Sequence, residues 1–594
     1  MKTTRFLPAL LLCAGTTPLL AAGDFTPADY QRALWMTTRF YGAQRMGTGP
    51  NWLLMDHTHK TSYVKDAADG RDLSGGWADC GDFPLFGQTF FYSAYTLLKA
   101  YDAFPTGFPD MYDGFDYSDY AASKNWKQAG GSPDGIPDLL QEVKYATDWI
   151  IKATPNAQTF YFQKGTGGAG NYGQHALWVT SGFYSATENA IAGGEKDKSR
   201  PVLKLGQSSG FGDGVVNDGS MPSFAAAALA IMARVYRKYD PAYADTCLAH
   251  ARLAYQYAKN QSGTGGTGFG GFYPANNRMT DDIVTAATEL FRTTGETSFR
   301  TDADSRKDGP QNHYYTYSYA TNDDVAYFNL GRYLGLTAKW NDFKSLFVDR
   351  YKNAGTGEGG LSTIGDNWGF LRYPANQAMI VGLYAKAAND ASYDQFIYDQ
   401  VDFILGGNNA KQSFVVGFCA GCTKSPQFPH HRNVYLDDRN AMKNITGIPE
   451  RNKEFGYLVG YAKAASGSFV ESMSAYEQTE GGIDYNAGLV GALGYIVSKV
   501  APVDTSKLGG TSTVRARRAF AVDLRITRSG DAVVFSAPTG IRSLEILSAD
   551  GRRVWQTSLE GGAATWSDAS ARGVYVAIAR SADGEAQSIR FVRD

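Results

Sequence analysis

Residues 223–232 read Ser-Phe-Ala-Ala-Ala-Ala-Leu-Ala-Ile-Met, a run that would be apolar around most of its circumference as a helix. The segment Ile136–Ile151 has the same property. Helices of this kind lie buried between other helices rather than on a surface. Both segments belong to a long series of 3.6-residue patterns, separated by loops rich in Gly, Tyr and Asn, from about residue 26 to 500. The sequence therefore predicts one large all-α domain.

This series contains about ten to twelve predicted helices and hardly any convincing strands. The clearest helical segments are Asp29–Met46, Leu85–Tyr101, Pro137–Lys152, Ser223–Tyr239, Tyr243–Lys259, Asp282–Thr294, Asp323–Leu334, Ala375–Ala388, Tyr393–Leu405 and Ala487–Lys499. No fixed repeat length relates them, which argues against an α-solenoid.

The composition narrows the class of protein. The chain has 594 residues, with 57 Lys and Arg against 59 Asp and Glu, so its net charge is −2. Such a balance leaves no excess of cations to displace phosphate counterions, and we expect no nucleic-acid partner. A hydrophobic content of 43% excludes a disordered chain. The 37 Tyr, 33 Phe and 10 Trp suit a hydroxylated ligand such as a sugar, or equally a large core.

The N-terminus has the features of an export signal. Lys2 and Arg5 precede the apolar run Phe6–Leu12, and small residues follow at Ala21–Gly23. A charged, an apolar and a small-residue region in this order are typical of a secretory signal peptide. We therefore expect residues 1–22 to be removed and the mature protein to be secreted or held at the cell surface.

Export changes how the cysteines are interpreted. Outside the signal the chain contains Cys80, Cys247, Cys419 and Cys422, too few for a disulfide scaffold in a chain this long. In an oxidising compartment, Cys419-Ala-Gly-Cys422 is a candidate for a local bridge. The same pair with His430 and His431 could instead be written as a zinc site.

The composition changes near residue 500. Residues 501–515 form a linker that contains Pro, Ser, Gly and Thr, and short runs with period-2 alternation follow it. We predict a small antiparallel β-sandwich over residues 516–594. Its expected strands are Ala519–Ile526, Ala532–Ser536, Ser543–Ser548, Arg553–Thr557 and Val574–Ala579.

Two clusters of acidic residues are candidates for catalysis. In Gly75–Phe83, Asp79 and Asp82 lie three residues apart in a turn that glycines allow to bend. Such a pair can hold and deprotonate a water, bind a cation, or cap the following helix. In Glu480–Gly488, Glu480 lies in a Gly-rich entry to a helix, where burial could raise its pKa, or where the helix dipole could stabilise its charge.

A third cluster, Phe428–Arg432, offers His430, His431 and Arg432 as donors to hydroxyls or an anion. Taken alone, it would more simply be a solvated surface loop.

Together these segments resemble glycoside hydrolase family 9, the inverting cellulases with an (α/α)6 barrel. The family's Gly-Gly-Trp-x-Asp-x-Gly-Asp is similar to Gly75–Asp82. Its Ser-x-Val-Val-Gly and Pro-His-x-Arg segments are similar to Ser413–Gly417 and Pro429–Arg432. Its Glu-x-x-x-Asp-Tyr-Asn-Ala-Gly is similar to Glu480–Gly488. The likeness runs in collinear order over about residues 28 to 500, so it implies that residues 23–500 are an (α/α)6 catalytic domain.

The resemblance implies the role of each site residue. Asp82 would be the general base, Asp79 would help to hold the attacking water, and Glu480 would be the general acid. An inverting enzyme keeps base and acid about 6.5–9.5 Å apart to leave room for that water, with Glu480 protonated and Asp82 ionised. The implied substrate-binding residues are His175, Trp178, His430, Arg432 and Tyr485.

Some positions depart from the family pattern. Phe83 stands where the family usually has His, and Glu471 stands where it has Asp. No cofactor is implied for catalysis. The family's calcium-binding stretch is depleted here, so that Asp218 and Asp281 are the remaining candidates for a structural calcium ion.

The resemblance, together with the export signal, therefore implies a secreted endo-β-1,4-glucanase that acts on β-glucan with inversion. The alternatives on the same fold are a mixed-linkage glucanase, a xyloglucanase or a processive cellobiose-releasing enzyme, and a non-catalytic glucan-binding protein is the alternative from another class. Residues 516–594 resemble the sorting or attachment domains of exported bacterial proteins, which implies contact with the cell surface or the secretion machinery.

Overall fold

The computed structural model divides the chain into two compact units, Met1–Gly509 and Gly510–Asp594. The boundary between them falls within the linker expected at residues 501–515. In the first unit the structure describes residues 23–48, 61–111, 133–165, 199–206, 217–261, 273, 278–310, 315–427, 429–431, 456–461, 469–472 and 474–508. In the second unit it describes residues 525–529, 532–537, 541–548, 553–558, 562–568, 573–581 and 586–593.

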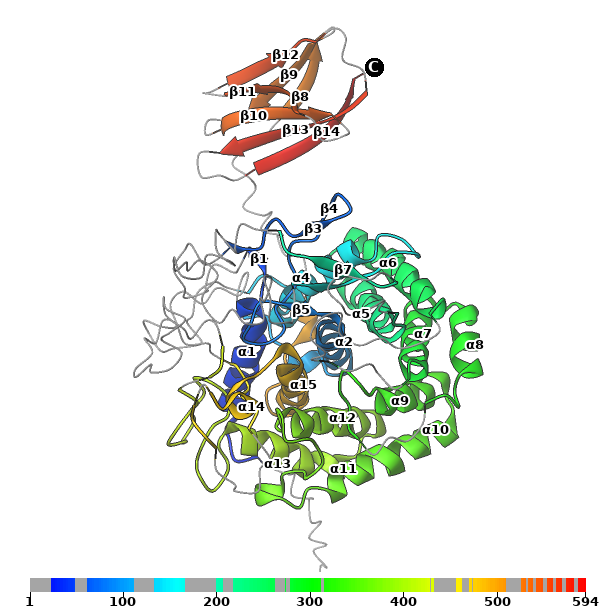
Figure 1. The fold of residues 1–594 in the computed structure, drawn as a ribbon, viewed down its shortest axis with the longest axis vertical. Coiled ribbons are helices and arrows are strands. Elements are labelled where there is room, and N and C mark those ends of the chain that lie inside the picture. Colours follow the sequence, from blue (N-terminus) through cyan, green and yellow to red (C-terminus); the bar gives the residue numbers. More distant parts are fainter. Residues whose placement is uncertain are drawn as a thin grey trace, which may run out of the picture. The chain divides into compact units, whose positions relative to one another are not determined.

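The first unit is a double ring of helices (Figure 1). Among its described residues, six helices form the inner ring, each packed against the next, and the last closes against the first. They are α2 (Gly87–Ala103), α5 (Ser220–Tyr236), α7 (Thr280–Thr294), α9 (Asp323–Leu334), α12 (Arg372–Ala388) and α15 (Ile483–Val500). The outer ring is formed by α1 (Pro27–Ala43), α4 (Asp138–Ala153), α6 (Pro241–Lys259), α8 (Thr297–Ser305), α10 (Thr337–Asp342) and α13 (Asp394–Leu405).

Along the chain, outer and inner helices alternate without exception over these described elements. Each inner helix is therefore entered from the same end of the barrel, and the inner helices point their N-termini toward one face. This is the (α/α)6 arrangement, and the all-α prediction is confirmed. The short elements between the rings are η2 (Pro105–Gly107), η8 (Phe343–Val348), α11 (Asp349–Asn353), η9 (Glu358–Gly360), η10 (Ala391–Tyr393), α14 (Tyr476–Thr479) and η14 (Thr505–Lys507).

The distribution of apolar residues around each helix determines whether it lies in the inner or the outer ring. Every residue of Ser223–Met232 in α5 is buried, and so is every residue of Ile483–Val497 in α15. In the outer helix α8, by contrast, only Phe299 and Ala303 are buried. An inner helix is enclosed by neighbours on all sides, whereas an outer helix needs only one apolar stripe. The expectation that the α5 segment lies between other helices is confirmed. The same expectation for Ile136–Ile151 is wrong, because this segment forms the outer helix α4, which leaves Gln141, Lys144 and Asp148 partly exposed.

Helix boundaries shift where local chemistry overrides periodicity. α12 begins at Arg372 rather than Ala375, because Pro374 in its first turn lacks only an N–H that would be unpaired there anyway. α1 begins at Pro27, after Thr26 and Asp29 close a capping box. The prediction missed α8 and α10, which are short and bury few side chains. Among the described helices, none is both long and apolar enough to cross a membrane.

The first unit also contains short strands, which the sequence did not indicate. β5 (Leu85–Phe86), β6 (Tyr161–Lys164) and β7 (Val202–Lys204) form a three-stranded antiparallel sheet, in which β5 directly precedes α2 and the other two strands follow α4. Leu85 was expected to begin a helix, but it pairs with Lys164 instead. The other small strands are β1 (Gly47–Thr48), β2 (Thr61–Ser62), β3 (Ala67–Ala68) and β4 (Arg71–Asp72).

The second unit consists of two antiparallel sheets. Their orders are β11-β10-β13-β14 and β12-β9-β8. The strands are β8 (Arg525–Ser529), β9 (Ala532–Ala537), β10 (Ile541–Ser548), β11 (Arg553–Thr557), β12 (Gly562–Trp566), β13 (Gly573–Ser581) and β14 (Ala586–Arg593). Phe535 of one sheet and Leu544 and Ile546 of the other share one buried core. A small all-β sandwich is confirmed, with β12 and β14 added to the expected strands. The first expected strand, Ala519–Ile526, overlaps β8 only at Arg525 and Ile526, and its residues 519–524 lie outside the described residues.

Candidate active site

The first acidic cluster lies in an irregular loop, residues 75–83, that leads through β5 into α2. Gly75 and Gly76 have φ of 101° and 74°, and a Cβ on Gly76 would lie 2.8 Å from the Leu85 side chain. Only glycine fits there. Gln44 of the segment after α1 holds the loop from the other side, since its amide donates to the carbonyls of Ala78 (3.3 Å) and Cys80 (2.5 Å). The turn is thus fixed by contacts far along the chain.

Asp79 is buried in this loop and surrounded by donors. The hydroxyl of Thr89 donates to one carboxylate oxygen and the hydroxyl of Tyr273 to the other. The thiol of Cys80 also donates to the second oxygen, at 3.1 Å. Burial raises the pKa of Asp79 to about 7, with the nearby charge of Asp82 as the next cause. A carboxyl group with this pKa is partly protonated near neutral pH.

Glu480, about 400 positions further along the chain, is brought to the same place. It follows α14, where its backbone N–H donates to the Tyr476 carbonyl at 2.9 Å. The backbone N–H of Ile483 donates to the Asp79 carbonyl at 2.9 Å, so the two acidic clusters are hydrogen-bonded to each other. The alternative that Asp79 caps the following helix is wrong, because its carboxylate accepts hydrogen bonds from side chains and not from the first backbone N–H groups of α2.

The environment of Glu480 favours its protonated form. Its side chain is 8% exposed. Burial raises its pKa well above the usual range, and the charges of Asp82, Asp79 and Asp484 raise it further. Asp82 itself is 1% exposed. Together the two clusters therefore place an acid held in its neutral form beside a pair of aspartates, which is the pairing that acid–base hydrolysis needs.

Asp484 is a fourth buried carboxyl group, which the sequence analysis left without a role. Its oxygen accepts from Arg372 at 2.7 Å. Burial raises the pKa of Asp484 and the Arg372 guanidinium opposes that rise. The same guanidinium lies over the ring of Tyr485, 5.1 Å from its centroid. Arg372 therefore supplies a cation to a group of carboxylates, and at the same time orients a predicted substrate-binding tyrosine.

Tyr485 is buried at the entry to α15. Its ring packs so tightly on Gly369, whose φ is 61°, that a Cβ there would clash with the tyrosine hydroxyl. This close approach requires glycine at position 369.

The two histidines of the third cluster differ. The backbone N–H of His430 donates to the Thr479 carbonyl at 3.0 Å, directly before Glu480, and its ring faces that of Tyr476 at 5.6 Å. His431 is fully buried, and its Nε2 lies 2.9 Å from the Gln44 side chain that holds the Asp79 loop. His430 thus lies beside Glu480, whereas His431 helps to hold the Gln44 side chain that supports the Asp79 loop. The predicted residues His175, Trp178 and Arg432 lie outside the described residues.

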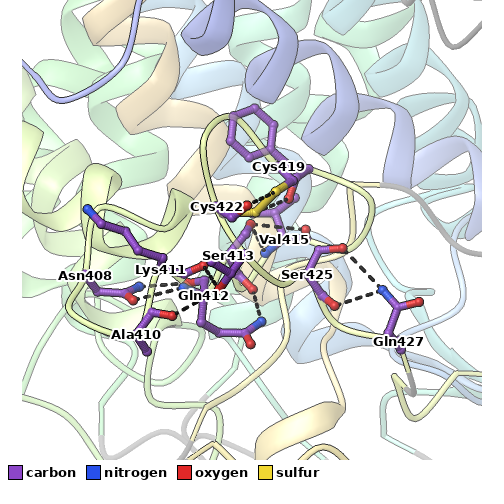
Figure 2. Close-up of a disulfide and its surroundings, with 12 residues drawn as sticks. Asn408, Ala410, Lys411, Gln412, Ser413, Val415, Cys419, Cys422, Ser425 and Gln427 are labelled. Carbon is purple, nitrogen blue, oxygen red and sulfur yellow. Dashed lines mark hydrogen bonds between the residues drawn. A yellow bond between two sulfur atoms is a disulfide. The ribbon is translucent and has the colours of Figure 1, made fainter.

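Cys419 and Cys422 form a disulfide, with Cα atoms 5.1 Å apart (Figure 2). The zinc alternative for this pair is therefore wrong, since both thiolates are consumed by the bridge. Figure 2 shows the bridge within the loop that also contains Gln412, Ser413 and Val415. The Asn408 side chain ties this loop by donating to the Gln412 carbonyl at 2.8 Å.

The calcium candidates lie at the N-termini of two inner helices. Asp218 precedes α5 and accepts from the Met221 N–H at 2.7 Å. Asp281 lies in the first turn of α7, where burial and then the charge of Asp323 raise its pKa to about 7. Among the described residues, no partner meets the geometric requirements of a hydrogen bond to either oxygen of buried Asp282 or to one oxygen of Asp281, although Ser220 and Asn322 lie near Asp282. Over the part of the chain that the structure describes, no three His, Cys, Asp or Glu side chains are grouped to hold one ion.

Sequence reasoning missed several residues of this site. Thr89 contacts Asp79 from α2, ten residues further along the chain, whereas Tyr273 and Arg372 contact the acids from distant segments, and none of the three was assigned a role. Asp484 could have been singled out, because it lies four residues after Glu480 in the same Gly-rich entry.

Comparisons with known proteins agree with this geometry. The family model described as glycosyl hydrolase family 9 matches residues 30–493. Endoglucanase A of Fibrobacter succinogenes is 32% identical over 479 residues, which cover 76% of this chain and 97% of that protein. Endoglucanase B of Cellulomonas fimi is 27% identical over 515 residues, 83% of this chain but only 44% of that longer protein.

Solved structures show the same fold. An endoglucanase from the termite Nasutitermes takasagoensis has a TM-score of 0.62 at 28% identity, covering 79% of this chain and 99% of that one. The cellulase Cel9M of C. cellulolyticum, solved in complex with cellobiose, has a TM-score of 0.61 at 27% identity, covering 79% of this chain and 98% of that one.

A double ring of helices with buried acids from two of its loops fits a glycoside hydrolase, and the family model and the relatives show this class. Because the family model spans most of the chain, the protein belongs to glycosyl hydrolase family 9. The expected family, fold class and enzyme class are confirmed, and catalysis in this family needs no cofactor.

Proposed function

We propose that the protein is an endo-β-1,4-glucanase that cleaves internal bonds of β-glucan with inversion at the anomeric carbon. The observation that carries this proposal is the pairing of a buried, protonated Glu480 with Asp79 and Asp82, across the Ile483–Asp79 hydrogen bond. The relatives with endoglucanase names support the activity. The complex of Cel9M with cellobiose supports a β-glucan as substrate.

Each acid has one step in the reaction. Asp82 acts as general base and takes a proton from the attacking water, which Asp79 helps to hold. Glu480 gives its proton to the leaving glycosidic oxygen. The raised pKa of Glu480 keeps that proton available near neutral pH, where an ordinary glutamic acid would be ionised. The water attacks from the face opposite the leaving group, so the product has the inverted configuration.

His430 and Tyr485 hold the sugar beside the scissile bond in this proposal. The backbone N–H of His430 is bonded to Thr479, the residue directly before the acid, and Tyr485 is fixed by Arg372 and Gly369. The resemblance adds Arg432 on the same side, and His175 and Trp178 as a donor and a stacking platform on the other.

Two measurements test the reaction. Proton NMR during hydrolysis of cellopentaose should show the α-anomer first; initial formation of the β-anomer would contradict inversion. Viscosity of carboxymethyl cellulose should fall well before reducing ends accumulate. Release of cellobiose with little loss of viscosity would instead favour the processive alternative, and higher rates on lichenan or xyloglucan would favour the mixed-linkage or xyloglucan alternatives.

We propose that one structural calcium ion binds near Asp218 and Asp281, with Asp282 beside them. The buried oxygens without hydrogen bonds on Asp281 and Asp282 fit a cation, because unpaired carboxylates are costly in a dry interior. The described residues supply only part of a coordination shell. Chelation with EGTA should lower the melting temperature and added calcium should restore it; an unchanged melting temperature would refute the site.

Export and attachment complete the proposal. Residues 1–22 direct secretion, and residues 516–594 serve as a sorting or attachment domain that contacts the cell surface or the secretion machinery. Mass spectrometry of the mature N-terminus tests the first part. Fractionation of cells that express the full chain or a chain ending at residue 509 tests the second, since equal release of both would contradict an attachment role.

A further inference from the structure

The loop that carries Asp79 and Asp82 has no regular structure, so its backbone carbonyls need other donors. Two buried basic side chains supply them, and burial lowers the pKa of one of them, Lys164, to about 7. The Lys164 ammonium donates to the carbonyl of Gly75, at the start of the loop, and to that of Leu73 at 3.2 Å. The Arg200 guanidinium donates to the carbonyl of Phe83, at the end of the loop, at 2.7 Å. The segment between these two attachment points contains both aspartates.

One carboxylate joins the two cations. Arg200 makes a bidentate pair with Asp66, through Nε at 3.2 Å and an NH2 group at 2.6 Å. Lys164 lies 3.4 Å from the same carboxylate. None of the three side chains is more than 3% exposed. Burial would raise the pKa of Asp66, but Arg200 and Lys164 outweigh it and lower that pKa.

The cluster is packed against neighbouring strands and aromatic rings. Lys164 belongs to β6 and is paired with Leu85 of β5, three residues after Asp82. The Arg200 guanidinium stacks on the ring of Tyr63, 3.6 Å from its centroid. The Tyr63 ring in turn meets the Phe83 ring edge-on at 5.4 Å. Both ends of the loop are therefore attached to one packed unit.

We propose that Asp66, Lys164 and Arg200 form a positioning cluster that holds Asp79 and Asp82 in the geometry required for attack of water. The proposal rests on the proposed function, because it concerns the same reaction. None of the three residues touches substrate. They act by fixing the carbonyls of Gly75 and Phe83, and hence the path of the backbone between them.

Energetics favour a positioning role over a purely stabilising one. A buried ion pair pays a desolvation cost that offsets much of its attraction, so such groups are weak sources of net stability. They do fix geometry, because a bidentate guanidinium allows one arrangement only. Here two cations share one carboxylate, and the remaining hydrogen-bonding capacity of the cations is directed at the catalytic loop.

The test compares Arg200→Met and Lys164→Met in the full-length protein. Each replacement keeps an apolar stem and removes the donors to the loop. We expect kcat on carboxymethyl cellulose to fall by roughly 10- to 100-fold, the usual cost of a displacement of about 1 Å at a reacting group. KM should stay within about threefold, because the groups that bind sugar are untouched.

The matched control is Lys204→Met. Lys204 lies on β7 of the same sheet and pairs with Asp69 at 2.7 Å, but this pair is partly exposed, and within the described part of the chain no hydrogen bond or ion pair joins it to residues 75–83. Its kcat should equal that of the wild type. An equal loss in Lys204→Met would overturn the proposal, since the effect would then belong to the sheet as a whole.

Unchanged kcat in both Arg200→Met and Lys164→Met would also overturn it. If the methionine variants do not fold, Arg200→Lys decides, assayed well below its melting temperature. This variant keeps the charge and loses the bidentate geometry. A reduced kcat at unchanged KM supports positioning, and a wild-type kcat refutes it. An inactive wild type would refute the proposed function itself, and the positioning role with it.

Discussion

Glu480→Gln gives the sharpest test of how the reaction proceeds. Glutamine has nearly the same shape as glutamic acid but carries no transferable proton, so the substitution removes the acid and little else. General acid catalysis typically contributes about 10²- to 10⁴-fold. At about 1.4 kcal/mol for each tenfold step, the barrier to glucan hydrolysis should rise by roughly 3–5 kcal/mol.

The size of the loss should depend on the leaving group. A glucan leaves as an alcohol and needs a proton, whereas dinitrophenol is acidic enough to leave as its anion. The variant should therefore lose most of its activity on amorphous cellulose, yet keep a large share of it on dinitrophenyl β-cellobioside. Asp82→Asn is the matched control, because both substrates need an activated water, and it should lose activity on both.

The same substitution should change how stability depends on pH. The folded-state pKa of Glu480 is raised by burial and then by Asp82, Asp79 and Asp484. The native state therefore binds an extra proton between the unfolded and folded pKa values, and the unfolding free energy falls as pH rises through that window. Denaturant unfolding of Glu480→Gln should show a flatter pH dependence than that of the wild type.

Two results would refute this reasoning. An equal loss on both substrates would show that Glu480 does not protonate the leaving group. A stability profile with the wild-type slope would show that its pKa is not raised in the folded protein.

Three further substitutions test the electrostatics and the cross-link. Asp79→Asn should stabilise the fold increasingly as pH rises from 4 to 7, because burial raises the pKa of Asp79 from 3.8 to about 7 and ionising it then costs the wild type on the order of 4 kcal/mol. Denaturant unfolding at pH 4 and at pH 7 measures the difference in unfolding free energy between variant and wild type. If that difference were the same at both pH values, the pKa of Asp79 would not be raised. Glu289→Gln should lower the unfolding free energy by about 3–5 kcal/mol. The buried ammonium of Lys99 lies 2.7 Å from the Glu289 carboxylate in the wild type and would lose this counter-charge. A loss below about 1 kcal/mol would show that the surrounding charges rearrange to compensate. Cys422→Ser should lower the unfolding free energy by about 2 kcal/mol, because the disulfide no longer restricts the unfolded chain. Dithiothreitol should lower the unfolding free energy of the wild type by the same amount and leave that of the variant unchanged.

Much of the fold was predictable because periodicity is local. The inner helices α5 and α15 were found from runs of apolar residues, and α9 from Asp323 to Leu334 without error. The outer helices α8 and α10 were missed for the opposite reason. They bury few side chains, so their sequences carry little of the pattern on which such a prediction depends.

In the candidate site, too, some residues could be predicted from local sequence and others could not. Asp79, Asp82 and Glu480 could be singled out because glycines and aromatics surround them in short motifs. The contacts of Tyr273 and Arg372 with the acids could not be predicted, since each spans more than a hundred residues of chain. The cluster of Asp66, Lys164 and Arg200 carries no motif at all, and only its shared burial reveals it.

By itself, the sequence determined the helical periodicity, the glycine turns and the kinds of acid available. Only the tertiary structure decided which acid holds a proton. Asp79 and Glu480 are ordinary carboxylic acids in the unfolded chain, and burial beside other carboxylates raises the pKa of both. The reason is that the energy of a charge depends on the surrounding dielectric and on its distance from other charges, and these quantities exist only once the chain has folded.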